Sequence, residues 1–271
     1  MSARSRRLLT ALLTLAAVLL IAAPAPAAAP RPATGPVRAG WGGTPFTIIA
    51  HRCNGSVYTE TTSVGCVKAA AKGATFLDGD IRFTSTDNPV MLHNEHLGIF
   101  GAPTVLIRNV STTAASKYVS ASNQNLMTLT QFRDTAVATD SDLSLEPKVR
   151  PTAAQWDKVD AILAPVKSRV FMNSFDPRVL ADARARGYTW LGLSTADDPR
   201  LPLPAGVDVV VEQAAKVDAG TVRAVTATGV EVWCYACETP ASWDAMAAAG
   251  VTGFATNQHD DAQAWARAYT P

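Results

Sequence analysis

The stretch Phe76–Asn94, FLDGDIRFTSTDNPVMLHN, opens with an apolar, strand-like run that carries Asp78 and Asp80 two residues apart. On a β-strand, residues two apart project from the same face, so the two carboxylates lie side by side. A turn rich in Thr, Asp, Asn and Pro follows, and a second apolar run, Pro89–Leu92, leads into His93. Because buried charges need a partner or a metal ion, this stretch predicts a functional site on a core strand.

On both sides of this stretch, short apolar or β-branched runs alternate with Ala-rich helical patterns. The expected strands are Phe46–His51, Phe76–Thr84, Leu143–Val149, Val170–Phe175, Trp190–Ser194, Val207–Glu212, Glu231–Tyr235 and Gly253–Thr256. The expected helices are Val64–Lys72, Leu129–Thr139, Ala153–Ala164, Pro177–Arg186, Ala219–Thr228, Pro240–Ala249 and Asp260–Tyr269. Several of these helices end just before a glycine, which is a common helix stop.

This alternation predicts an α/β fold: a single TIM-like (β/α)8 barrel over residues 44–271. Such a barrel typically takes about 250 residues. The alternative is an open doubly wound sheet, but no G-x-G-x-x-G follows the first strand, so a dinucleotide-binding sheet lacks its main support. The polar, weakly periodic segment Leu97–Met127 is expected to form a short excursion after strand 2, over one mouth of the barrel.

The first 29 residues predict a signal peptide. Arg4–Arg7 supplies positive charge, Leu8–Ala23 is apolar, and Ala27–Ala29 offers the small residues that signal peptidase requires. A transmembrane anchor is the alternative, but the apolar core is short for a bilayer span of at least about 17 residues and runs into Pro24. We therefore expect export, with residues 30–43 as a flexible leader and a secreted, extracytoplasmic protein.

The composition fits an ordinary globular domain. The 271 residues carry a formal net charge of +1, and 48% are hydrophobic, which is enough for a sizeable core. The near-neutral balance gives no electrostatic reason to expect nucleic acid or an anionic membrane as the main partner. We expect a monomer that acts on a small molecule, with no nucleic-acid partner and at most transient membrane contact.

The chain has four cysteines, which suit an oxidising compartment. Two local pairs, Cys53–Cys66 and Cys234–Cys237, are the simplest of the three possible connectivities. A zinc site would need four such ligands to converge, and a redox-active C-x-x-C would need a thioredoxin-like context. Structural disulfides are therefore the favoured interpretation.

Ionisable residues gather at the ends of the expected strands. His51 and Arg52 end the first strand, and Glu146 and Lys148 lie two apart on the third. Active sites of TIM barrels lie at the carboxyl ends of the strands, so these residues are expected to meet the Phe76–Asn94 group there. A cluster of three carboxylates suits Mg²⁺ or Ca²⁺ better than zinc.

The ordered set of motifs resembles the glycerophosphodiester phosphodiesterases, TIM-barrel enzymes related to the sphingomyelinase D and phospholipase D toxins. The motifs are Ala50-His51-Arg52, Glu60-Thr61-Thr62, Gly73-Ala74, Asp78-Gly79-Asp80, Thr84–Val90, His93-Asn94, Leu145-Glu146-Pro147-Lys148, Ser174-Phe175, Val232-Trp233 and Ala255-Thr256-Asn257. A lone His-Arg pair would mean nothing. The set in this order spans the mature chain and is specific.

The resemblance implies a metal-dependent phosphoric diester hydrolase that converts glycerophosphodiesters to an alcohol and glycerol phosphate. It makes His51 and His93 the general acid/base pair. It implies a divalent cation, Mg²⁺ or Ca²⁺, held by Asp78, Asp80 and Glu146. In the family's usual account, a glycerol hydroxyl attacks the phosphorus and water then opens the cyclic phosphate.

The remaining site residues are assigned by the same resemblance. Arg52 and Lys148 would neutralise phosphoryl charge. Glu60 would reach the site from its loop, or only cap the following helix. Trp233 would form a wall for the alcohol portion, or only pack in the core. His96 and His259 are expected at the surface or beside helix caps.

The chain departs from the family pattern at four places, with Asp78 in place of Glu, Asn94 of Asp, Cys53 of Gly and Thr61 of Asn. These changes leave two alternatives open. One is a sphingomyelinase D-like phospholipase that acts on choline phospholipids. The other is a non-catalytic barrel that binds phosphodiesters without turnover.

Overall fold

The computed structural model describes residues 44–53 and 58–270. The predicted signal peptide and leader, residues 1–43, lie outside these described residues. Among the described helices, none combines the length and the apolar character needed to cross a bilayer.

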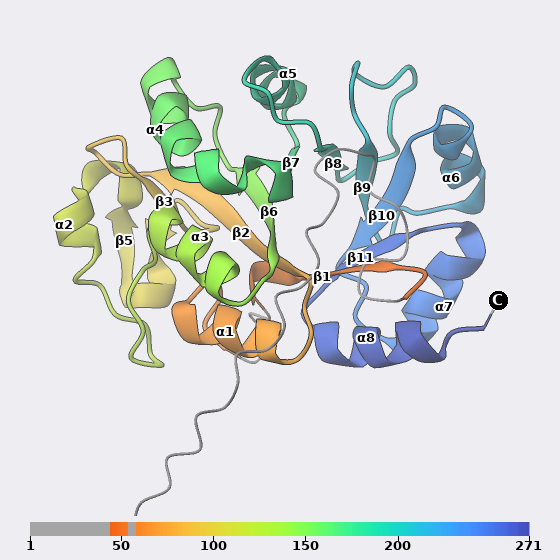
Figure 1. Cartoon of the computed structure of the whole chain (residues 1–271), viewed down its shortest axis with the longest axis horizontal. Helices are drawn as coiled ribbons and strands as arrows, with labels where there is room; N and C mark the ends of the chain where they lie inside the picture. Colours follow the sequence, from red (N-terminus) through yellow and green to blue (C-terminus); the bar gives the residue numbers. More distant parts are fainter. Residues whose placement is uncertain (1–43, 54–57, 271) are drawn as a thin grey trace, which may run out of the picture. The chain divides into compact units, whose positions relative to one another are not determined.

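Eight parallel strands form a closed barrel, which confirms the predicted fold (Figure 1). In sheet order they run β1, β11, β10, β9, β8, β7, β6 and β2, and β1 then pairs with β2 through Ile49 and Phe76. Their bounds are β1 Thr47–Ala50, β2 Phe76–Phe83, β6 Asp142–Pro147, β7 Val170–Ser174, β8 Leu191–Thr195, β9 Val209–Gln213, β10 Glu231–Tyr235 and β11 Gly253–Thr256. The last two match their predicted bounds, and the others begin or end one to two residues away.

The connecting helices lie outside the strands (Figure 1). Their bounds are α1 Ser63–Ala71, α3 Leu129–Ala138, α4 Ala153–Leu163, α5 Pro177–Ala185, α6 Ala219–Thr226, α7 Pro240–Ala249 and α8 His259–Ala268. Side-chain caps explain where most begin. Thr128 and Thr152, for example, form capping boxes with Gln131 and Gln155, which satisfies backbone groups that the first turn leaves open.

The excursion after β2 has more structure than its sequence suggests. The strand β3 (Pro89–Met91) pairs antiparallel with β2, and a hairpin of β4 (His96–Leu97) and β5 (Ala102–Leu106) follows, then the short helix α2 (Thr112–Ala115). A small core of its own, which includes Leu92, Leu97, Phe100, Ile107 and Leu126, holds it together. His93 lies before the predicted excursion Leu97–Met127, in the loop between β3 and β4.

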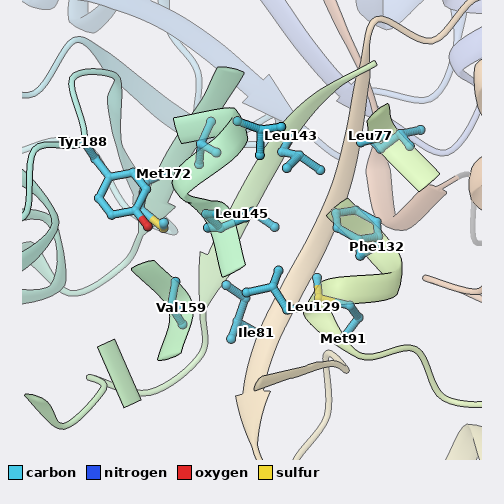
Figure 2. Close-up of a cluster of buried hydrophobic side chains, with 14 of the residues drawn as sticks. Leu77, Ile81, Met91, Leu129, Phe132, Leu143, Leu145, Val159, Met172 and Tyr188 are labelled. Atoms are coloured by element: carbon cyan, nitrogen blue, oxygen red, sulfur yellow. The ribbon is translucent and has the colours of Figure 1, made fainter. Parts of the chain in front are cut away.

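Two apolar layers support the site. Between strands and helices, Leu77, Leu143 and Leu145 pack against side chains from α3 and α4 (Figure 2). Inside the barrel, rings from different strands interlock; the ring centroids of Phe171 and Trp233 are 4.8 Å apart. These densely packed rings fill the interior of the barrel, so the barrel has a packed core rather than a central pore.

Both predicted disulfides are present, Cys53–Cys66 and Cys234–Cys237, and neither pair leaves a free thiol. The first ties the loop after β1 to the helix α1. The second ties the end of β10 to the segment that leads into α7.

His259 lies beside a helix cap, as one of its two expected places, since it is the first residue of α8 and follows the N-cap Gln258; the surface alternative is wrong. Its side chain is fully buried at the start of α8, and Nε2 lies 3.1 Å from the carbonyl oxygen of Ala69, which only accepts hydrogen bonds. Nε2 therefore carries the proton, and the buried Nδ1 has no hydrogen-bond partner. His96 is half-buried, with Nδ1 accepting from the Gly98 amide at 3.3 Å.

Burial lowers the pKa of His259 below its ordinary value of 6.5, although Asp260 opposes the shift. The unfolded chain then binds more protons than the folded one, so stability present above pH 6.5 is lost as the pH falls. For one group the slope reaches at most about 1.4 kcal/mol per pH unit. We expect urea denaturation to show a steeper loss of stability below that pH for the wild type than for His259→Gln. Equal slopes would mean that His259 does not contribute.

Candidate functional site

One pocket at the carboxyl ends of the strands collects most of the predicted site residues. Its lining includes His51, Arg52, Asp78, Asp80, His93, Glu146 and Lys148. These residues come from the turn after β1, from β2, from β6 and the position just after it, and from the loop after β3, segments far apart in the sequence. The barrel thus brings both histidines, three carboxylates and two cations into one concave space.

The pairing of β2 with β6 sets the carboxylates. Asp80 lies opposite Glu146 and Asp78 opposite Ser144 in the parallel register. Since alternate residues share a face, all four side chains point to the barrel interior, in two layers. Asp80 and Glu146 form the upper layer, toward the mouth.

Asp80 is the most buried of the three carboxylates, with 5% of its surface exposed. Its Oδ1 lies 3.6 Å from Lys148 Nζ, and its Oδ2 lies 3.6 Å from Arg52 Nε. Both distances exceed a normal hydrogen bond, and Oδ2 has no hydrogen-bond partner among residues 44–53 and 58–270. An anionic oxygen in this state can accept a further cationic or protic group.

Asp78 is bound differently. Its Oδ1 accepts a hydrogen bond of 2.7 Å from the Ser144 hydroxyl, and its Oδ2 accepts one of 3.0 Å from the Arg52 backbone amide. Both oxygens are therefore engaged by the protein. Asp78 joins the loop after β1 to the strand β6 at the floor of the pocket.

Burial and neighbouring charge change the acidity of two groups at the mouth. Burial raises the pKa of Glu146 to about 7, and Asp80 adds to the shift, while Lys148, 2.6 Å away, opposes it. Burial lowers the pKa of His93; Asp80 opposes this shift, and Arg52 and Lys148 favour it. Neutral imidazole is thus the favoured form of His93 in this arrangement.

Arg52 occupies an unusual backbone conformation. Its φ of 48° and that of Cys53, 57°, lie in the left-handed region, which costs non-glycine residues about 1 kcal/mol or more each. The contacts that hold it include the hydrogen bond from its backbone amide to Asp78, the Cys53–Cys66 disulfide beside it, and a 2.9 Å ion pair between Arg52 Nη1 and Glu60. Glu60 thus acts on Arg52, and it is not among the residues that line the pocket.

Trp233 does not form the expected wall. The Trp233 side chain is fully buried against Phe171 and Trp190, one layer beneath the pocket. Gly253 makes room for the Trp233 ring, because a Cβ atom on residue 253 would lie 2.6 Å from it. The aromatic wall is made instead by Phe175 and Tyr235, whose ring centroids are 6.2 Å apart. Tyr235 follows Trp233 by two residues on the same strand. The motif therefore identified the correct face of β10, but the residue of that face that lines the pocket is Tyr235.

Several pocket residues escaped the sequence analysis. Asn173 and Ser194 line the pocket from β7 and β8, and the amide of Asn173 lies 3.3 Å from Ser144 Oγ. Asn257, which is not among the lining residues, accepts from His51 Nδ1 at 3.0 Å, a contact that its motif alone does not reveal. Inward alternation along β7 and β8 is the signal that could have revealed Asn173 and Ser194.

Residues 51–261 match the glycerophosphoryl diester phosphodiesterase family. This chain belongs to that family. It is a phosphodiesterase, in agreement with the resemblance of its motifs. No curated protein sequence matches the chain.

Solved structures agree on the fold. A phosphodiesterase from Oleispira antarctica in complex with the product sn-glycerol-3-phosphate is 17% identical, with a TM-score of 0.74 over 81% of this chain and 96% of that one. A glycerophosphodiester phosphodiesterase from Parabacteroides distasonis is 15% identical, with a TM-score of 0.72 over 82% and 97%. The Thermotoga maritima enzyme is 19% identical, with a TM-score of 0.64 over 79% and 96%.

Members of this family generally depend on divalent cations, and the carboxylates of the pocket are the candidate ligands. Within residues 44–53 and 58–270, no three His, Cys, Asp or Glu side chains are arranged so that they could hold a metal ion. The donor chemistry nevertheless fits at the upper layer, where Asp80 Oδ2 is buried without a hydrogen bond and Glu146 faces the same space. Asp80 and Glu146 are thus the better-placed candidate ligands, and metal binding by all three carboxylates stays a prediction.

Proposed function

We propose that this phosphodiesterase hydrolyses glycerophosphodiesters to an alcohol and glycerol phosphate, using His51 and His93 as a general acid/base pair. One observation carries the proposal: both histidines line the pocket that also holds Arg52, Lys148 and the carboxylates. Hydrolysis of a phosphodiester needs a proton acceptor for the nucleophile, a proton donor for the leaving alkoxide, and positive charge at the phosphoryl oxygens. The pocket offers candidates for all three.

Each histidine has one ring nitrogen occupied. His51 Nδ1 lies 3.0 Å from Asn257 Oδ1, and His93 Nδ1 lies 3.0 Å from Asn94 Oδ1. An amide oxygen accepts a hydrogen bond, so in both rings Nδ1 carries a proton and Nε2 exchanges one with the substrate. The two histidines can therefore take the donor and acceptor roles in turn.

The cations and carboxylates would set the charge around the phosphate. Arg52 and Lys148, held by Asp80, Glu60 and Glu146, would contact the phosphoryl oxygens. A divalent cation bound by Asp80 and Glu146 would add Lewis-acid stabilisation of the same oxygens. Phe175, with 47% of its surface exposed, and Tyr235 would contact the alcohol portion.

The sn-glycerol-3-phosphate named in the Oleispira antarctica structure supports the choice of substrate, since that product is the fragment which glycerophosphodiesters release. The N-terminal sequence and the two disulfides support export to an extracytoplasmic space. We further propose that the protein acts as a monomer, with Mg²⁺ or Ca²⁺ as its cation.

The purified mature protein should release glycerol phosphate from glycerophosphocholine in the presence of Mg²⁺ or Ca²⁺, and EDTA should abolish the release. Turnover of sphingomyelin or lysophosphatidylcholine, without turnover of glycerophosphocholine, would instead assign a sphingomyelinase D-like activity. Binding of glycerophosphocholine with no turnover of any of the three would refute the enzymatic proposal.

A further inference from the structure

The carboxylate of Glu238 binds Asn257, the residue that contacts His51. The side chain of Glu238, from the loop between β10 and α7, reaches the segment that follows β11. Its Oε2 accepts a hydrogen bond of 2.8 Å from the Thr256 hydroxyl and one of 2.9 Å from the Asn257 backbone amide. Its Oε1 lies 3.0 Å from Asn257 Nδ2.

These contacts determine how the Asn257 amide is oriented. Three donors converge on Glu238, and a carboxylate oxygen only accepts, so the NH₂ group of Asn257 must face Glu238. The carbonyl oxygen of the same amide must then face the opposite way. It does so, because Oδ1 lies 3.0 Å from His51 Nδ1.

The orientation of Asn257 in turn decides which nitrogen of His51 bears the proton. An amide oxygen is only an acceptor, so Nδ1 must be the protonated nitrogen of neutral His51. Nε2 is then left with the lone pair, and His51 lines the pocket. With the amide reversed, an NH₂ group would face Nδ1 and favour the other tautomer, with the lone pair turned away from the substrate.

We propose that Glu238 is a positioning residue that selects the Nδ1–H tautomer of His51 through the amide of Asn257. The inference rests on the proposed function, in that His51 exchanges its catalytic proton at Nε2. Glu238 is not among the residues that line the pocket, and it is linked to His51 through Asn257. In a Ser-His-Asp triad, a buried aspartate holds the catalytic imidazole in one tautomer. Glu238 acts in the same way on His51, but through the side-chain amide of Asn257.

Glu238→Gln tests the proposal, because Gln presents an amide group that can either accept from Asn257 or donate to it. Both orientations of Asn257 become accessible. In ¹⁵N-histidine NMR spectra at pH 8, we expect His51 to be the Nδ1–H tautomer in the wild type and a mixture in Glu238→Gln. We expect kcat to fall about 10–100-fold, the range found for outer partners of functional histidines, with KM little changed.

A double variant supplies the rescue. In Glu238→Gln with Asn257→Asp, the Asp carboxylate accepts from His51 Nδ1 whichever way it turns, and its second oxygen accepts from the Gln amide. The Nδ1–H tautomer and most of the lost kcat should return. Glu231→Gln is the matched control, since Glu231 lies at the opposite end of β10 and accepts from Trp233 Nε1 and Thr252.

The outcomes separate the two proposals. A pure Nδ1–H tautomer in Glu238→Gln, or a loss of kcat that the double variant does not restore, would overturn the positioning role. If the wild type fails to hydrolyse glycerophosphodiesters while the tautomer responds as expected, the proposed function fails and the relay from Glu238 to His51 stands.

Discussion

His51→Ala and His93→Ala are each expected to lower kcat for glycerophosphodiester hydrolysis by about 10²–10⁴-fold, the usual contribution of a positioned acid or base. Both rings lie in the pocket with Nδ1 already bound to an asparagine oxygen, so each offers Nε2 for proton exchange. Alanine removes that nitrogen. Steady-state kinetics with glycerophosphocholine measure the effect.

His96→Ala is the control, because His96 lies outside the pocket and bonds to its own loop. Its kcat should match the wild type within about twofold. The double variant of His51 and His93 should lose little more than the worse single variant, since residues that act as a unit are not additive. Nearly unchanged kcat in either single variant would remove that histidine from the mechanism.

The barrel could be predicted because its signals are local and repeated. Strand runs such as Glu231–Tyr235 are bounded by helix stops and caps, and each βα unit carries its own version of the pattern. The strands β3 and β4 were missed because three- and two-residue strands offer too few alternations to reveal a period, and β5 because its five residues show no strict alternation of burial. Their packing depends on contacts made only after the chain folds.

The sequence predicted most of the charged residues that line the pocket, but it did not predict how far below the mouth of the barrel each side chain lies. Alternation places Trp233 and Tyr235 on the same inner face, but only the tilt and packing of the barrel decide that Trp233 lies beneath the pocket and Tyr235 in it. The position of His259 beside a helix cap was expected, but the burial of its ring was not. A polar sequence around a helix start is typical of the surface, and the ring is buried because α1 supplies a carbonyl acceptor at Ala69.

Partners within the site lay further beyond the sequence. That Ser144 binds Asp78 follows from the register of β2 and β6, which no local pattern fixes. That Glu238 reaches Asn257 depends on two loops that meet at the mouth. Such contacts distinguish carboxylates that look equivalent in the sequence. Asp78 and Asp80, both on β2, are expected to differ most in their roles.

Asp80→Asn and Asp78→Asn are expected to fail in different ways. In the described part of the chain, Asp80 Oδ2 is buried without a hydrogen bond and lies 3.6 Å from Arg52 Nε, so this oxygen can still accept a metal ion. Asp80→Asn should weaken binding of Mg²⁺ or Ca²⁺ at least about tenfold and lower kcat, because the charge of the ligands sets the affinity of an oxygen site. Isothermal titration calorimetry measures the first effect and steady-state kinetics the second.

Asp78 already accepts from Ser144 and from the Arg52 amide with its two oxygens. Asparagine offers one oxygen only, so its NH₂ group would face one of these donors and leave a buried bond unmade. Asp78→Asn should therefore cost about 1–3 kcal/mol of stability in urea denaturation, while the folded fraction keeps most of its cation affinity. If Asp78→Asn instead weakens cation binding as much as Asp80→Asn at unchanged stability, Asp78 is a direct ligand, and the bonds to Ser144 and Arg52 must give way when the cation binds.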